Sequence, residues 1–289
     1  MKTRTAATIH TSESLTVKSK DTGQEYLISV SLPATYDHQP ETTFPVIYVL
    51  DGNLLFEMVT GISRLMQMGR LLPEVIVVSI GYPLEGFYGD DFQQFFIRRA
   101  RDLYAVVDER YEQFAAKVSG AGSSAITTGG AEPFRKFVTG ELASLVESRY
   151  RASSEDKTLL GTSSGGHFVI YAMLQQPQSF EKYVVGSPAL GYGEGALFKL
   201  ESDYSKQHND LPIKLFLGIG GEEEHAPFSP AGYLGTIVSV SDFYRFSAIL
   251  QGRGYEGLQL MKRIFEGFDH TDVIGPIVAA GLRNVFANL

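Results

Sequence analysis

Five continuous apolar runs constrain the fold of this chain more than any other feature of its sequence. They lack the strict alternation of a half-exposed strand, which is typical of a parallel sheet buried under helices on both faces. Helical patterns separate the runs, and this alternation predicts an α/β fold with one open, mostly parallel sheet. The predicted strands are residues 44–50, 75–80, 157–160, 183–185 and 214–219. The predicted helices are residues 54–68, 133–150, 167–176, 240–253 and 273–287.

Strands of a different kind are predicted at the two ends of this pattern. Residues 15–20 and 25–32 alternate on either side of a polar turn at 21–23, which predicts an N-terminal antiparallel hairpin. Residues 259–265 also alternate and predict a last strand. The sheet is therefore expected to begin with a hairpin and to continue as parallel strands.

The organisation of the chain predicts a single domain over residues 1–289, because we find neither a linker nor an internal repeat. Residues 1–11 are polar and expected to be flexible. Two long stretches, 83–132 and 190–211, are expected to be irregular segments near an active site. Loops of that length in a compact domain are usually functional or mobile.

One apolar run breaks into Gly161-x-Ser163-x-Gly165 and is followed directly by an apolar helical pattern. This is the pattern of a nucleophile elbow, in which a serine on a sharp strand-to-helix turn exposes its hydroxyl. The motif alone is common, but strand, turn and helix occur here in the required order. We therefore predict that Ser163 is a catalytic nucleophile.

A serine nucleophile needs a histidine base, and the chain offers six histidines. In α/β-hydrolases the order is serine, acid, histidine, which disfavours His10 and His38. His167 begins a helix, where a packing or capping role is simpler, and His208 lies in a polar loop. His270 follows the end of the last predicted strand and precedes the final helix, so we predict that it is the base.

The acid is expected after the strand at 214–219, where Glu222, Glu223 and Glu224 follow one another. We choose Glu224, because a turn opened by Gly221 would direct its third following residue back towards the histidine. Glu222 and Glu223 remain open alternatives. His225 beside these carboxylates could suggest a metal site, but other ligands at metal-binding spacing are missing, and no metal is expected.

A serine that attacks a carbonyl carbon also needs backbone N–H groups that hold the developing oxyanion. The residue after the nucleophile, Ser164, is expected to supply one. The loop at 51–53 follows a predicted strand, and Gly52 allows a close turn there. We favour the N–H of Asn53 as the second donor, although an ordinary tight turn explains the spacing equally well.

Composition excludes several other kinds of protein. The chain has no cysteine, which excludes thiol catalysis and disulfides, and its net charge of −8 argues against binding nucleic acid. No stretch is apolar enough to span a membrane, and the N-terminus lacks the apolar centre of a signal peptide, so a cytoplasmic location is expected. With Ser163 as the nucleophile, the expected partner is a small-molecule ester, and a homo-oligomer stays possible.

Taken together, these motifs resemble the putative esterase family of α/β-hydrolases, close to the branch of esterase-D-like enzymes and trilactone siderophore esterases. The resemblance covers nearly all of residues 12–289. The matching stretches are 46–52, 80–82, 99–103, 128–134, 141–142, 160–166, 221–224 and 265–270. It implies an α/β-hydrolase fold and serine-dependent ester hydrolysis without a cofactor. The family's nucleophile falls on Ser163, its histidine on His270 and its acid within 222–224.

The resemblance also includes Arg99, Arg101 and Asp102, which we interpret as structural support near the site rather than as substrate contacts. The main functional hypothesis is hydrolysis of small or short-acyl esters through a Ser-His-Glu triad and an acyl-enzyme. A first alternative is a trilactone siderophore esterase, which would need a wide, aromatic-lined cleft. The chain has no tryptophan but many tyrosines and phenylalanines. A second alternative is a non-catalytic binding module.

Overall fold

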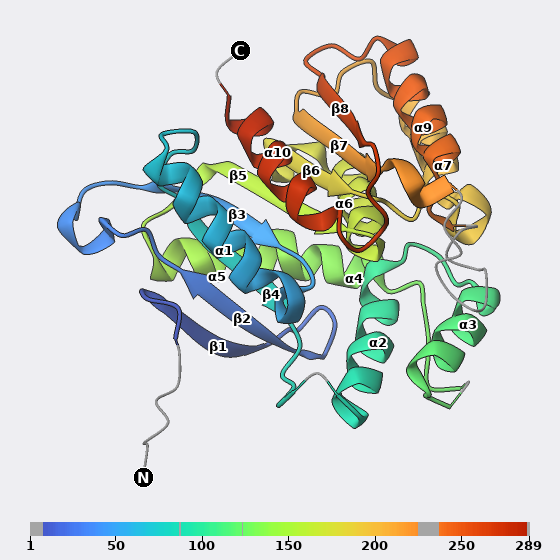
Figure 1. Ribbon diagram of the computed structural model, residues 1–289, viewed down its shortest axis with the longest axis horizontal. Coiled ribbons are helices and arrows are strands. Elements are labelled where there is room, and N and C mark those ends of the chain that lie inside the picture. Colours follow the sequence, from blue (N-terminus) through green and yellow to red (C-terminus); the bar gives the residue numbers. More distant parts are fainter. Residues whose placement is uncertain (1–7, 87, 123, 225–236, 288–289) are drawn as a thin grey trace.

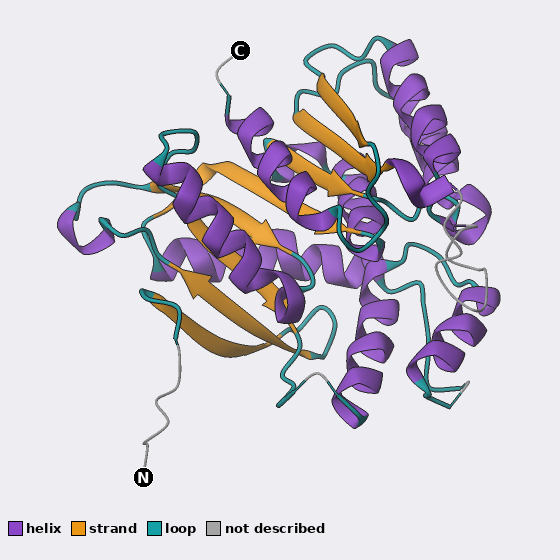
Figure 2. Ribbon diagram, in the orientation of Figure 1, coloured by secondary structure: helices purple, strands orange, loops and turns teal. Residues whose placement is uncertain are grey.

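Eight strands form one sheet in the order β1-β2-β4-β3-β5-β6-β7-β8 (Figures 1 and 2). The computed structural model describes residues 8–86, 88–122, 124–224 and 237–287. Strand β2 pairs antiparallel with β1 and with β4, and the pairs from β4 through β3 and β5 to β8 are parallel. The strands are β1 Ser12–Lys18, β2 Glu25–Ser31, β3 Phe44–Val49, β4 Ile76–Gly81, β5 Ala152–Thr162, β6 Lys182–Gly186, β7 Lys214–Gly220 and β8 Gln259–Phe265. The predicted hairpin and mostly parallel sheet are confirmed.

Helices cover both faces of this sheet, as the sequence predicts (Figure 1). Helices α1 and α10 pack over one face, on the buried cluster that includes Ile47, Leu160 and Ile277. The larger cluster on the opposite face is covered mainly by α4 to α7 and α9. The helices are α1 Gly52–Met68, α2 Asp90–Leu103, α3 Glu109–Ser119, α4 Ala131–Lys136, α5 Ala143–Arg149, α6 Ser164–Gln175, α7 Tyr192–Ser205, α9 Val240–Arg253 and α10 Ile274–Phe286.

The helix predicted at 133–150 is interrupted by a π-helical turn, η2 Phe137–Leu142, which joins α4 to α5. The Thr139 hydroxyl donates to the Arg135 carbonyl oxygen at 2.9 Å. In this wider turn the Glu141 carboxylate lies against the β1–β2 turn, where it accepts hydrogen bonds from the backbone of Lys20 and Asp21. A π-turn inside a helix re-aims side chains in this way, and here it ties the helix to the hairpin.

The two segments predicted to be irregular contain helices, so that part of the prediction is wrong. Residues 83–132 form α2 and α3, and residues 190–211 contain α7. Asp108 caps α3 by accepting hydrogen bonds from the N–H groups of Arg110 and Tyr111, at 3.0 and 3.2 Å. Gly120 ends the same helix in the left-handed conformation, with φ of 73°. Both are ordinary helix-end signals that the sequence already carried.

Helices α2 and α3 extend beyond the sheet, at the edge where the parallel strands end (Figure 1). Among the described residues, no helix has both the length and the apolar character that a membrane span needs. The carboxyl edge of the sheet and the α2–α3 unit face each other. The crevice outside the carboxyl ends of the strands is the usual place for a ligand in an open α/β sheet.

Candidate active site

Ser163 lies on a strained turn between β5 and α6. Its φ of 58° and ψ of −121° are rarely adopted by a residue with a side chain. The turn is tight enough that a Cβ on Gly161 would lie 2.5 Å from the Gly165 carbonyl oxygen. The Ser163 N–H donates to the Gly186 carbonyl oxygen of the neighbouring strand at 2.8 Å, which fixes the turn to the sheet. This geometry is that of a nucleophile elbow.

His270 connects Ser163 to a buried carboxylate. Its Nε2 lies 3.0 Å from Ser163 Oγ, and its Nδ1 lies 2.7 Å from Glu223 Oε2. The other oxygen of Glu223 accepts hydrogen bonds from the Gly220 N–H at 2.7 Å and from the Ser187 hydroxyl at 2.5 Å. Glu223 is completely buried, so these contacts and the histidine hold its charge in place of water.

The structure corrects the choice of acid, because Glu223 and not Glu224 contacts the histidine. The short 3₁₀ helix η4, Gly221–Glu224, follows β7. With about three residues per turn, successive side chains of such a helix point roughly 120° apart, so only one of the three glutamates faces His270. Glu224 points instead to α9, where its carboxylate accepts from the Ser241 N–H at 2.9 Å and hydroxyl at 2.6 Å.

The two residues predicted as oxyanion donors lie at the N-termini of helices near the nucleophile. Ser164 is the first residue of α6, and Asn53 lies in the first turn of α1. The Asn53 side chain forms two hydrogen bonds with the backbone of Tyr82. It accepts from the Tyr82 N–H at 2.7 Å and donates to the Tyr82 carbonyl oxygen at 2.9 Å. N–H groups in a first helical turn lack an intrahelical partner, so the N–H groups of Ser164 and Asn53 can donate hydrogen bonds to an anion. Their role in the reaction stays a prediction.

Arg99 lies directly beside the elbow. Its guanidinium pairs with both oxygens of Asp51, at 2.7 and 2.8 Å, and donates to Ser164 Oγ at 2.7 Å. Tyr104 contacts the same hydroxyl at 2.6 Å. Burial on its own would lower the pKa of Arg99, but the charge of Asp51 outweighs burial and raises that pKa. Arg99 is therefore a fixed cation that supports the elbow and also lines the cleft.

Arg101 and Asp102, predicted as structural support, form a separate pair. Arg101 Nε and Nη2 lie 2.6 and 2.8 Å from the two oxygens of Asp102. The Tyr26 hydroxyl of β2 also donates to Asp102 at 3.0 Å. Burial raises the pKa of Asp102, while Arg101 opposes this. These contacts tie α2 to the hairpin end of the sheet.

A cleft of about 490 Å³ lies above Ser163 and His270. Its volume is typical of a small-molecule site. Most of its wall is apolar, and α2 and α3 supply the majority of the apolar side chains. The lining residues are Asp51, Leu54, Leu55, Phe92, Phe95, Phe96, Arg99, Tyr111, Phe114, Ala115, Val118, Thr162, Ser163, Ser164, His270, Thr271 and Ile274. Residues 83–132 thus line the site as expected, whereas none of the described lining residues comes from 190–211.

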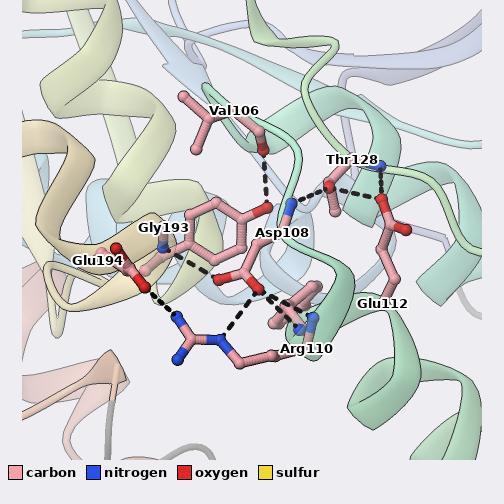
Figure 3. A network of polar contacts seen from close by, with 9 residues as sticks. Val106, Asp108, Arg110, Glu112, Thr128, Gly193 and Glu194 are labelled. Carbon is pink, nitrogen blue, oxygen red and sulfur yellow. Dashed lines mark hydrogen bonds and ion pairs between the residues drawn. The ribbon is translucent and has the colours of Figure 1, made fainter.

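Polar contacts at the start of α3 hold this wall to the body of the protein (Figure 3). Besides capping α3, Asp108 accepts a hydrogen bond from the Gly193 N–H of α7 at 3.2 Å. Arg110 forms an ion pair with Glu194 at 3.2 Å. Gly193, Glu194 and Gly195 all have left-handed backbone conformations, so α7 begins with a sharp bend that reaches α3.

Among the histidines that the structure describes, only His270 forms a hydrogen bond with the side chain of Ser163 or Glu223. His167 is completely buried, its Nδ1 lies 2.9 Å from the Ala189 carbonyl oxygen, and burial lowers its pKa to about 4. This agrees with the packing role predicted from its place in the helix. His225 lies outside the described residues. Within the described part of the chain, no group of three or more histidine, aspartate or glutamate residues could hold a metal ion.

Comparison with known proteins gives consistent matches. The model of a family described as putative esterase matches residues 19–206. Ferri-bacillibactin esterase BesA of Bacillus subtilis is 28% identical over 97% of this chain and 91% of its own length. Siderophore triacetylfusarinine C esterase of Aspergillus fumigatus is 27% identical over 92% and 90%. The crystal structure of BES protein from Bacillus cereus covers 100% of this chain and 99% of its own, with a TM-score of 0.78 and 22% identity.

Proposed function

The chain belongs to the putative esterase family and is a carboxylic ester hydrolase, and on that premise we propose that it cleaves trilactone siderophores through Ser163, His270 and Glu223. The observation that carries this proposal is the continuous hydrogen-bonded line from Ser163 through His270 to Glu223 at the base of an aromatic cleft. A base and an orienting acid are what a serine hydroxyl needs to become a nucleophile.

The proposed reaction follows from these positions. His270 Nε2 takes the hydroxyl proton of Ser163 while the oxygen attacks the ester carbonyl carbon. The Ser164 and Asn53 N–H groups hold the oxyanion, and His270 returns the proton to the leaving alcohol. Water, activated by the same histidine, then hydrolyses the acyl-enzyme and releases the acid. Glu223 accepts a hydrogen bond from the Nδ1–H of His270, which fixes the tautomer of the histidine and stabilises its imidazolium form.

The aromatic wall favours a trilactone over a short-acyl ester as the natural substrate. Phe92, Phe95 and Phe96 of α2 and Phe114 of α3 line the cleft, where they can pack on rings carried by the substrate. Of the relatives described above, one is named as a ferri-bacillibactin esterase and the other as a siderophore triacetylfusarinine C esterase. Small esters would still react, since the catalytic groups do not depend on the wall. The alternative of a silent binding module is disfavoured by the complete line of catalytic groups.

The proposal places the activity in one domain, because all eight strands share one sheet. The predicted cytoplasmic location stays a prediction, which fractionation of the native cells would test.

The test is hydrolysis of p-nitrophenyl esters and of a cyclic tris(catecholate) trilactone by the wild type and by Ser163→Ala. We expect the variant to lose about 10⁴-fold or more in kcat on both substrates, since it lacks the nucleophile. Ser205→Ala, at the half-buried last position of α7 and outside the cleft lining, is the matched control and should keep full activity. Ester hydrolysis that survives in Ser163→Ala would contradict the serine mechanism, and turnover of small esters alone would contradict the trilactone substrate.

A further inference from the structure

The cleft above Ser163 has no free positive charge among the described residues that line it. Arg99 is the one cationic side chain in that lining. Both of its edges are occupied, since Asp51 binds Nε and Nη2, and Ser164 binds Nη1. The ion pair is almost fully buried, with 12% of the Arg99 side chain and 3% of the Asp51 side chain exposed. Arg99 is therefore already neutralised before a substrate arrives.

The catalytic groups add negative charge at the base of this cleft. His270 must be neutral when it acts as a base, whereas Glu223 is the anion that orients it. The charges of Asp51, Arg99 and Glu223 then sum to one negative charge close to the reacting serine. In a cleft with apolar walls such a charge is weakly screened and repels an anionic substrate.

The apolar walls of the cleft also disfavour an anionic substrate. Phenylalanine rings and Val118 surround the space in which the substrate would lie. Against these side chains an ionised group loses hydration and gains no hydrogen bond in return, which is costly. A neutral aromatic ring instead gains contact area and favourable ring packing. Charge and surface thus select the same kind of ligand, one that is aromatic and uncharged.

We propose that the enzyme acts on the neutral, iron-free form of a tris(catecholate) trilactone in preference to its ferric complex. This inference rests on the proposed function. Binding of Fe³⁺ removes two protons from each of three catechol groups, so the ferric complex carries three negative charges. In the free ligand the phenolic groups keep their protons near neutral pH, because an ordinary phenol has a pKa of about 10.

This preference would separate the chain from BesA, whose name describes it as an esterase of the ferric form of bacillibactin. The two proteins are 28% identical, so residues that line a cleft can differ between them. An enzyme selective for the iron-free ligand removes unused siderophore, whereas one selective for the ferric complex releases iron. The charge of the cleft therefore bears directly on the biological role.

The experiment compares kcat/KM of the wild type for the iron-free trilactone and for its ferric complex at neutral pH. We expect the iron-free form to be hydrolysed at least about tenfold more efficiently. Added salt should narrow the difference, because screening weakens the repulsion of the trianion. Equal efficiency, or a preference for the ferric complex, would overturn the inference.

A pair of matched substitutions tests the electrostatic cause. Val118 lines the cleft from α3 and is 43% exposed, whereas Val107 precedes α3, outside that lining, and is 67% exposed. Val118→Lys should raise the ratio of ferric to iron-free hydrolysis about threefold to tenfold, in a salt-dependent way. Val107→Lys adds the same charge elsewhere and should leave the ratio unchanged. An unchanged ratio in Val118→Lys would contradict an electrostatic origin.

The same assay includes p-nitrophenyl butyrate, so that failure of this inference is distinguishable from failure of the proposed mechanism. If neither form of the trilactone is hydrolysed while Ser163-dependent cleavage of the butyrate persists, the inference and the trilactone substrate are both overturned. The serine mechanism would then still stand. Loss of Ser163 dependence on every ester would instead overturn the proposed function itself.

Discussion

The carboxyl edge of the sheet and the α2–α3 unit face each other across one cleft, but they are held in different ways. The groups at the sheet edge follow strand ends, and their contacts are short and mostly buried, such as the 2.7 Å contact between His270 and Glu223. The α2–α3 unit lies outside the sheet, and its contacts with the body range from the buried Arg99–Asp51 pair of α2 to the exposed Arg110–Glu194 pair of α3. This division suggests that the sheet fixes the chemistry and the α2–α3 unit decides which ester reaches it.

The largest effect should come from the sheet edge, through Glu223. Glu223→Gln keeps the size of the side chain but removes its charge, so His270 loses the partner that fixes its tautomer. We expect kcat on p-nitrophenyl butyrate to fall about 10³-fold to 10⁴-fold. Glu224→Gln is the matched control, because Glu224 contacts Ser241 instead, and should change kcat about twofold or less. Equal losses in both variants would contradict the assignment of the acid.

This contrast also shows how far sequence reasoning reaches. Ser163 and His270 could be found from chain order, because parallel strands bring their carboxyl ends to one edge and the residues that follow them meet there. The choice among Glu222, Glu223 and Glu224 could not, because it depends on how a single 3₁₀ turn orients three successive side chains. The same chemistry is available at each of the three positions, and only the backbone distinguishes them.

The sheet was predictable for a related reason: long apolar runs leave few alternatives to a buried parallel strand. The α2–α3 unit was harder, because its apolar residues are divided between the core and the cleft and charged residues are interspersed among them. Its helix ends carried recognisable signals, Asp108 and Gly120, that identify α3 in retrospect. The bend at 193–195, which holds α3 in place, depends on tertiary contacts that no local pattern encodes.

His167 lies at the junction between the two regions. The next largest effect expected is the change that its protonation causes in the free energy of unfolding. Its Nε2 accepts weakly from the Ala105 N–H, between α2 and α3, at 3.4 Å, and its Nδ1 lies beside the Ala189 carbonyl oxygen. Burial lowers the pKa of His167 to about 4, against about 6.5 in the unfolded chain. Between these values the unfolded chain binds the proton first, so the free energy of unfolding falls as the pH drops from 6.5 to 4.

We expect this loss to reach about 3 kcal/mol, measured as the free energy of urea unfolding across that pH range. His167→Gln should flatten the pH dependence relative to the wild type, whatever its effect on stability at pH 7. His208→Gln, in the exposed turn after α7, is the control and should leave the slope unchanged. If the unfolding free energy of His167→Gln depends on pH as steeply as that of the wild type, His167 is not the cause of the pH dependence.

The smallest effect is expected at Asp108, which caps α3 and joins it to α7. Asp108→Ala removes both the helix cap and the acceptor for Gly193, which should cost about 1–2 kcal/mol of stability. A looser α3 should lower kcat/KM for the trilactone about threefold to tenfold, mainly through KM, with p-nitrophenyl acetate hydrolysis unchanged. Asp108→Asn keeps an oxygen for the cap and should restore most of the stability. Equal losses on both substrates would mean that α3 supports the catalytic groups themselves, which would break the division between the two regions.

Covalent labelling of the nucleophile tests the central claim most directly. The protein would be incubated with a small fluorophosphonate, which reacts with activated serines, and the adduct would be located by peptide mass spectrometry. The account predicts a single adduct on Ser163, formed rapidly in the wild type and in Glu224→Gln and at least about 10³-fold more slowly in Glu223→Gln. An adduct on another serine, or labelling of Ser163 at the same rate in both glutamate variants, would contradict it.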